Sequence, residues 1–318
     1  MRYNIDFVGL FPTIFKVSGA LVVISLVLFL GKGLSFGIDF NGGTIMHLRF
    51  EQAVAEDVLH GMFKKVTVPG FEPEKVVVQP VADDLGVKTA GATSREYIIQ
   101  YPIIGSPEKL DELNKQVAET LRGAAPVKFE VLDETSVGPT IGREMKRDSF
   151  YAAIISIIGI LFYMGWRFEL NSSLGAVIAL VHDAIITLGF LIVVQQEFDV
   201  TVLAGVLTLL GFSINDSIVV LDRIRENKKL VRGETLANIV NMSINQTLGR
   251  TINTSMTVLF TLLALLLLGG PTLHGFAVVL TFGITIGTYS SVAIASPVML
   301  WLSEREKESK KKSRSMGS

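Results

Sequence analysis

Asp216 lies within the otherwise apolar stretch 208–221, and its position needs a chemical explanation. A carboxylate inside a lipid-embedded helix costs about 2.5–3.5 kcal/mol on insertion scales, so such a residue usually faces the interior of a helix bundle and marks an ion or proton path. Ser213 and Ser217 follow helical spacing with Asp216, which predicts two hydroxyl groups on the face of the carboxylate. The pattern favours a transport or proton-linked role, and the alternative is a hydrogen-bonded structural acid that holds helices together.

A second stripe of polar residues offers a counter-charge for this acid. Its members recur at intervals of three and four residues and are Thr247, Arg250, Thr254, Thr257 and Thr261. Arg250, at the base of the stripe, is the expected partner of Asp216. The competing interpretation is an interfacial arginine whose side chain extends toward lipid phosphate. The spacing alone leaves both open.

His182 and Asp183 form a third polar site in an apolar segment. A histidine beside a carboxylate can relay protons, because its unperturbed pKa is near 6.5. The pair can equally be structural, since adjacent helical residues point about 100° apart. We therefore treat His182, Asp183, Ser213, Ser217 and Thr254 as residues of either an accessory proton path or helix packing.

Long apolar segments must position these groups. The chain has 318 residues, of which 49% are hydrophobic and 19% charged, with a mean hydropathy of +0.48. A helix of about 20 apolar residues crosses a bilayer. Six such spans are predicted, at 12–32, 149–166, 174–195, 200–221, 251–270 and 275–302. The first, within the N-terminal segment 1–33, has no signal-peptide cleavage pattern, so we expect it to be retained.

The distribution of positive charge predicts an orientation for these spans. The connection 222–250 and the tail 303–318 are rich in Lys and Arg, which places both on the cytoplasmic side by the positive-inside rule. Both termini are then cytoplasmic, and the polar region 34–148 lies outside. Within the connection, residues 236–244 have the pattern of an amphipathic helix lying on the membrane surface. We expect the tail to lack regular structure.

The outer region 34–148 alternates strands with helices. Strands are predicted at 43–50, 75–81, 96–101 and 127–137, and helices at 53–66 and 106–123. This β-α-β-β-α-β order is that of ferredoxin-like domains. The expected fold class is therefore a polytopic α-helical membrane protein with six transmembrane helices and an α+β ferredoxin-like extracytoplasmic domain between helices 1 and 2.

Other features narrow the chemistry. The chain has no cysteine, which excludes disulfides and thiolate metal sites, and its four histidines are scattered without ligand spacing. We expect no metal or cofactor and no enzymatic activity. In the sixth span Gly283, Gly287 and Ser291 recur every four residues, a spacing typical of close helix packing.

Four motifs resemble a known family. They are FGIDFNGGT (36–44), VGPTIGREM (137–145), GFSINDSIVVLDRIREN (211–227) and NQTLGRTINTS (245–255). In this order they resemble the SecF family of bacterial protein-export subunits, which belongs to the resistance–nodulation–division superfamily. Members of that superfamily have six-span halves with a large outer domain between the first two spans.

The resemblance implies a role for the chain and for its residues. It implies a subunit of the bacterial inner membrane that pairs with SecD, assists the SecYEG channel, with YajC and YidC as further partners, and uses the proton-motive force to move unfolded preproteins. Nucleic acid has no part in this. Asp216 and Arg250 match the proton-path residues of the family, with protons as the coupling ion. Asp39, Gly42 and Gly43 match a signature at the outer membrane boundary.

Three alternatives remain. An intramembrane aspartyl protease would use Asp183 and Asp216, but the expected G-x-G-D pattern is absent. The chain could also be half of a proton-driven small-molecule efflux transporter. The third alternative is an assembly scaffold for SecD that conducts no protons.

Overall fold

The computed structural model describes residues 5–68, 71–81, 93–102 and 107–316. Its contacts divide the chain into two compact units. The helical unit comprises the chain up to Ser35, residues 152–197 and the chain from Thr201 onward. The α+β unit comprises residues 36–151 together with the short segment 198–200.

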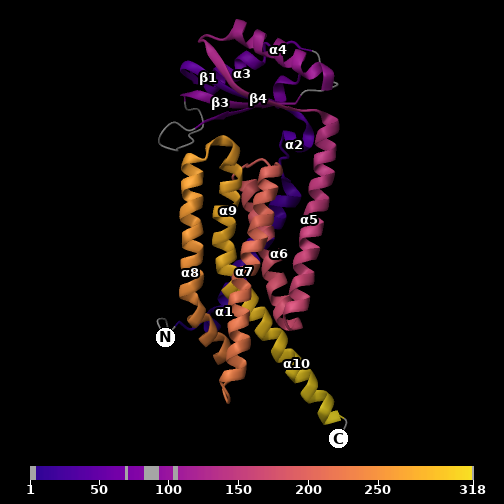
Figure 1. Ribbon diagram of the computed structural model, residues 1–318, viewed down its shortest axis with the longest axis vertical. Coiled ribbons are helices and arrows are strands. Elements are labelled where there is room, and N and C mark those ends of the chain that lie inside the picture. Colours follow the sequence, from indigo (N-terminus) through magenta and orange to yellow (C-terminus); the bar gives the residue numbers. More distant parts are fainter. Residues whose placement is uncertain (1–4, 69–70, 82–92, 103–106, 317–318) are drawn as a thin grey trace. The chain divides into compact units, whose positions relative to one another are not determined.

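Six helical segments among the described residues are long and apolar enough to cross a membrane (Figure 1). Five are single helices: α1 (Phe7–Gly31), α5 (Pro139–Arg167), α6 (Leu170–Val193), α7 (Val200–Leu230) and α8 (Leu236–Leu268). The sixth consists of α9 (Gly270–Ser290), a π-helical segment (Ser291–Ala295) and α10 (Ser296–Met316). Each predicted span overlaps one of these segments.

Several helices extend beyond the predicted spans. Helices α7 and α8 take up most of the connection 222–250, so the prediction of a separate surface helix at 236–244 is wrong. Its apolar residues Leu236, Ile239, Val240 and Ile244 pack in the core of the helical unit, the last two completely buried. Helix α10 likewise continues to Met316, where an irregular tail was expected.

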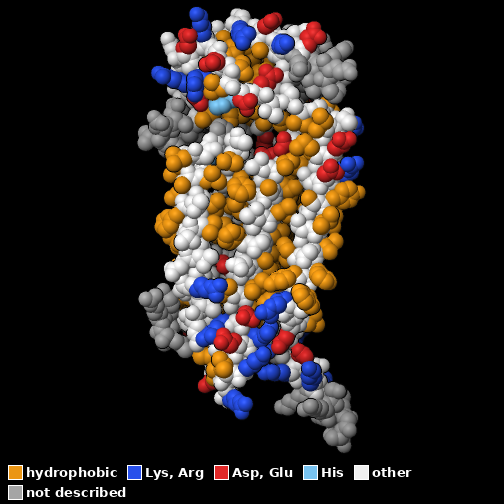
Figure 2. All heavy atoms as spheres, viewed as in Figure 1, with side chains coloured by type: hydrophobic (Ala, Val, Ile, Leu, Met, Phe, Trp, Pro, Cys, Tyr) orange, Lys and Arg blue, Asp and Glu red, His pale blue; other side chains and the backbone are white. Residues whose placement is uncertain are grey.

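The interior of the helical unit is formed by α6, α7 and the sixth segment, each of which has half or more of its apolar window buried. Small residues allow this close packing. A Cβ atom on Gly175 of α6 would lie 2.6 Å from the carbonyl oxygen of Ala295. Helices α1, α5 and α8 are largely exposed. Figure 2 shows apolar side chains on the outer faces of the helices and Lys and Arg gathered where α7 ends and α10 continues.

The α+β unit is built on a four-stranded antiparallel sheet in the order β2-β3-β1-β4 (Figure 1). Its elements, after the short helix α2 (Ile38–Asn41), are β1 (Gly43–Ala55), α3 (Glu56–Phe63), β2 (Val77–Pro80), β3 (Thr93–Tyr101), α4 (Pro107–Ala124) and β4 (Phe129–Val137). A short 3-10 turn, η1 (Pro73–Lys75), precedes β2. The sequence of strands and helices is the predicted one, although β1 runs five residues further than expected, to Ala55.

Alternate residues of the central strands form the core of this unit. Tyr97, Ile99 and Tyr101 on β3 and Met46 and Leu48 on β1 are completely buried, as the two-residue period of a strand requires. The hydroxyl group of Tyr101 donates to Asn114 Oδ1 on α4 (3.2 Å). Burial raises the pKa of Tyr101 well above its ordinary value, so the phenol keeps this proton.

The start of β1 gives the first prediction. Gly43 has φ of +146°, and a Cβ atom there would lie 2.7 Å from the carbonyl oxygen of Tyr101. Such backbone strain costs on the order of 1–3 kcal/mol for other residues. We expect Gly43→Ala to accelerate hydrogen–deuterium exchange of β1 and β3. Gly61→Ala is the control, because Gly61 lies inside α3 with no atom within 4 Å. Equal hydrogen–deuterium exchange in the Gly43→Ala and Gly61→Ala variants would contradict the claim that position 43 requires glycine.

Candidate functional site

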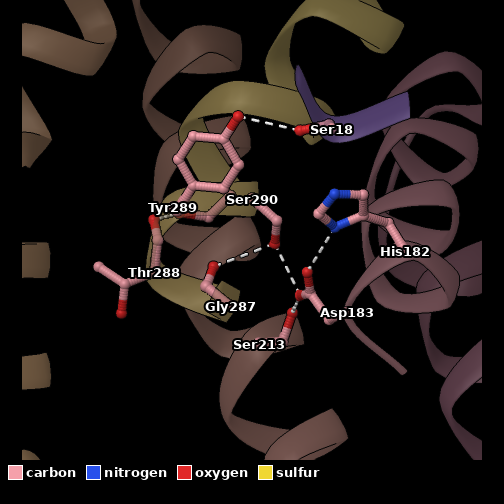
Figure 3. A network of polar contacts seen from close by, with 9 residues as sticks. Ser18, His182, Asp183, Ser213, Gly287, Thr288, Tyr289 and Ser290 are labelled. Carbon is pink, nitrogen blue, oxygen red and sulfur yellow. Dashed lines mark hydrogen bonds and ion pairs between the residues drawn. The ribbon is translucent and has the colours of Figure 1, made fainter. Parts of the chain in front are cut away.

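Asp183 on α6 is the centre of a buried polar network in the helical unit (Figure 3). Its side chain is completely buried. His182 Nδ1 lies 2.9 Å from Oδ1, and the hydroxyl groups of Ser213 (2.5 Å) and Ser290 (2.6 Å) donate to Oδ2. These partners come from α6, α7 and the end of α9, so one carboxyl group connects the three innermost segments.

The network can hold its proton in two ways. Ser290 Oγ lies 2.6 Å from Asp183 Oδ2 and 3.1 Å from the carbonyl oxygen of Gly287. A hydroxyl group has one proton, so Ser290 donates to one of these acceptors at a time. If it donates to Gly287, a protonated Asp183 can donate to Ser290. Ionised and protonated Asp183 are therefore both compatible with the same positions of the heavy atoms.

His182 connects this network to α1. Its ring packs against Tyr289 at 6.5 Å between centroids, and the Tyr289 hydroxyl pairs with Ser18 Oγ at 2.9 Å. The other ring nitrogen, Nε2, is buried and has no hydrogen-bond partner among the described residues. With its proton on Nδ1 the ring donates to Asp183 and leaves no unpaired N–H at Nε2, so this tautomer fits the described contacts.

Asp216 on α7 has a different environment. It is 6% exposed, and its hydrogen bond comes from Ser255 Oγ on α8 at 3.5 Å, the upper limit for such a bond. Ser255 in turn pairs with Thr288 Oγ1 on α9 at 2.6 Å. The two buried acids thus bind different partners, whereas a protease dyad requires carboxylates that share a proton.

Arg250 lies on the exposed side of α8 and forms no ion pair with Asp216 in the described portion of the chain. Thr254, one turn later, donates to the carbonyl oxygen of Arg250 (2.9 Å). The buried side of α8 instead carries Thr247, Thr251 and Ser255. The face of α8 that meets Asp216 is therefore adjacent to the predicted stripe, and the role of Arg250 stays a prediction.

The two serines beside Asp216 also differ from expectation. Ser213 donates to Asp183 rather than to Asp216, because its position on α7 faces α6. Ser217 is buried, and its hydroxyl group has no hydrogen-bond partner among the described residues. The expectation that both hydroxyls serve the Asp216 carboxylate is therefore wrong for Ser213.

The small residues of the sixth segment pack against α7. A Cβ atom on Gly283 would lie 2.5 Å from Leu209 Cδ2, and one on Gly287 would lie 3.2 Å from Ser213 Cβ. Ser291 begins the π-helical segment and donates to the carbonyl oxygen of Thr288 (2.9 Å). Gly287 thus gives Ser213 and Ser290 the space to reach Asp183.

The signature residues Asp39, Gly42 and Gly43 lie in the α+β unit, at α2 and the start of β1. Sequence reasoning did not single out Ser18, Ser255, Thr288, Tyr289 or Ser290. The spacing Thr247, Thr251, Ser255 was visible in the sequence as an alternative stripe. Isolated hydroxyl groups such as Ser18 and Ser290 give no periodic signal.

Fold and site together define a multi-pass membrane protein with two ionisable side chains buried among its helices. Comparisons with known proteins agree with this class. Residues 116–305 match the family described as protein export membrane protein SecD/SecF, C-terminal, and residues 27–54 match the SecD/SecF GG motif. The chain belongs to this SecD/SecF family.

Two relatives match this chain over most of their length and most of its own. The protein translocase subunit SecF of Calditerrivibrio nitroreducens is 42% identical over 92% of both chains. That of Pseudomonas aeruginosa is 38% identical, over 94% of this chain and 92% of the relative. The crystal structure of SecDF from Thermus thermophilus, described as a translocon-associated membrane protein, superposes with a TM-score of 0.80 at 34% identity. The match covers 95% of this chain and 39% of that one.

The network around Asp183 gives the second prediction. In Asp183→Asn the amide oxygen can accept from both serines, but His182 can accept from the amide only if its proton moves to Nε2, which has no partner among the described residues. We expect a modest loss of thermal stability from this one unpaired N–H. Asp183→Leu leaves His182 and Ser213 without their acceptor, at about 1–3 kcal/mol for each unpaired group. We expect a clearly lower melting temperature in detergent, measured by size-exclusion chromatography after heating. Equal stability of the Leu variant and the unmodified chain would show that the network does not hold the helices.

Proposed function

We propose that the chain is an auxiliary subunit of the Sec protein translocase that acts with SecD and uses the proton-motive force to complete preprotein export across the cytoplasmic membrane. Relatives of matching length are named protein translocase subunit SecF, which supports the Sec pathway. The proton-linked role is supported above all by Asp216, whose carboxyl group is buried among membrane helices and has one long hydrogen bond among the described residues.

The proposed partner is SecD. The chain spans 39% of the solved SecDF protein, so a second chain would supply the remainder of a comparable assembly. SecYEG, with YajC and YidC, and the unfolded preprotein are the further proposed partners. The α+β unit, with its β-α-β-β-α-β order, is the proposed ferredoxin-like domain on the outer side of the membrane. Both termini would then be cytoplasmic, in keeping with the Lys and Arg residues of α7 and α10.

The two acids differ in how they would respond to a proton. Asp183 has three donors, so its surroundings satisfy an ionised carboxylate. Asp216 has one long bond from Ser255, and an ionised carboxylate there would gain from better partners. We therefore assign proton exchange to Asp216 and helix positioning to Asp183. Arg250 would approach Asp216 in the alternative state of the bundle.

The energy available matches a two-state cycle. A proton that crosses a potential of 100 mV releases about 2.3 kcal/mol. This is enough to change the populations of two conformations severalfold if they bind the proton with different affinity. The Ser255–Thr288 hydrogen bond connects α8 with α9, so a change in the bonds of Asp216 would alter the contacts of both helices.

The alternative function is an assembly scaffold that conducts no protons. The hydrogen-bond network around Asp183 favours it, because this network is well suited to hold helices together. Asp216→Asn separates the two functions. The amide keeps the size of the side chain but cannot release a proton, so we expect proton-dependent completion of export in membrane vesicles to fall to the level of vesicles lacking the protein. The rate is measured with a preprotein already engaged in the channel.

Asp222→Asn is the matched control, because Asp222 lies on the same helix but is exposed. It should leave export unchanged. Normal export with Asp216→Asn, at normal expression and assembly, would favour the scaffold.

A further inference from the structure

The signature segment 36–43 is bound to the short segment 198–200 that precedes and begins α7. Phe36 and Phe198 form a parallel β-bridge, and the backbone N–H of Gly37 donates to the carbonyl oxygen of Phe198 (3.0 Å). The α2 turn itself is held by Asn41, whose Nδ2 donates to the carbonyl oxygen of Phe36 (2.8 Å). Two segments about 160 residues apart in the chain thus share backbone hydrogen bonds.

Asp39 caps the beginning of α7. Its Oδ2 accepts a hydrogen bond from the backbone N–H of Val200, the first residue of that helix, at 3.0 Å. The first N–H groups of a helix have no acceptor within the helix, and the positive end of its dipole favours a carboxylate. Such a cap usually comes from the residue preceding the helix. The acceptor for Val200 lies outside that position, on α2, so this hydrogen bond connects two elements.

Aromatic rings surround this connection. Phe36, Phe40 and Phe198 pack with centroids 5.9–6.1 Å apart. Lys146, on the first half of α5, lies 4.4 Å above the ring of Phe36. The cluster therefore joins α2, the segment before α7 and α5 by contacts of three kinds: backbone pairing, ring packing and a cation over a ring.

The two glycines of the signature allow the backbone to pass close to α5 and the sheet. Gly42 has φ of +77°, and a Cβ atom there would lie 3.1 Å from Pro139 Cα. A Cβ atom on Gly142 of α5 would in turn lie 3.1 Å from the backbone nitrogen of Gly42. Gly43 passes equally close to Tyr101 of β3. No larger residue fits these positions without moving backbone atoms.

We propose that the segment 36–43 is a fixed joint that ties the beginning of α7 to the α+β unit, with Asp39 as its positioning residue. Because α7 also carries Asp216, a displacement of this helix when Asp216 changes its protonation is transmitted to the α+β unit through the joint. This inference rests on the proposed function, in which a change in the protonation of Asp216 causes the displacement of α7. It adds the residues that transmit it.

The first experiment removes the joint and restores it by another bond. Asp39→Ala deletes the cap, and we expect the rate of proton-dependent export to fall severalfold. The pair Phe36→Cys and Phe198→Cys places two thiols across the β-bridge, where Cα atoms about 5 Å apart suit a disulfide. The native chain has no cysteine to interfere. Oxidation of the pair should restore export to the Asp39→Ala chain, and reduction should abolish the rescue.

Two controls make the result decisive. Asp39→Asn keeps an acceptor for the N–H of Val200 and should be nearly normal, whereas Asp133→Ala removes an exposed acid of β4 and should have no effect. If Asp39→Ala fails to accumulate, the cysteine pair is tested with Asp39 intact, where the disulfide should preserve export. Loss of export on oxidation, or normal export with Asp39→Ala, would overturn a fixed joint.

The second experiment measures transmission without export. Spin labels are attached to Lys115→Cys on α4 and Lys307→Cys on α10, both exposed positions on elements other than α7, in the full-length chain reconstituted in proteoliposomes. We expect Asp216→Asn to shift the distance distribution when Asp39 is present and not when it is replaced by alanine. A shift that survives Asp39→Ala would overturn the joint alone. Absence of any shift would contradict both the joint and the proposed function.

Discussion

The helical unit depends on one constraint: a carboxyl group within the hydrocarbon region must find its hydrogen-bond donors in the protein, because no lipid chain supplies them. Asp183 meets this constraint with donors from three helical segments. This need for hydrogen-bond donors then determines which residues pack around Asp183. Gly287 must be small, and Ser290 must point inward at the position where the sixth segment changes from α to π geometry.

The π-helical segment has a local cause in the sequence. Pro297 has no backbone N–H and cannot complete the α-helical bond to the carbonyl group four residues earlier. The helix widens over Ser291–Ala295, and π-segments of this kind are frequent at functional sites. The position of the proline therefore places the irregularity next to Ser290, which donates to Asp183.

The sequence alone predicted the apolar segments, the order of strands and helices along the chain and the burial of Asp216, because each has a period or a cost that can be read from a single chain. The sequence was a poor guide to which side chains form hydrogen bonds with each acid. Ser213 was expected on the face of Asp216 but donates to Asp183, because its position on α7 faces α6, which carries that second acid. The tail was expected to be irregular and the connection 222–250 to hold a separate helix, but α10 continues to Met316 and residues 236–268 form one helix, α8.

Helix α7 has contacts with both Asp39 and Asp183 and also carries Asp216. Its beginning is held by Asp39, its middle by the bond from Ser213 to Asp183, and it carries Asp216 one turn beyond that bond. Val200 and Asp216 are 16 residues apart, about 24 Å along a helix at 1.5 Å per residue. An intact helix is stiff over this length because shortening or stretching it would break its backbone hydrogen bonds. A change in the bonds of Asp216 therefore reaches Val200 only if α7 moves together with Asp183 of α6, because the buried bond from Ser213 ties the two helices.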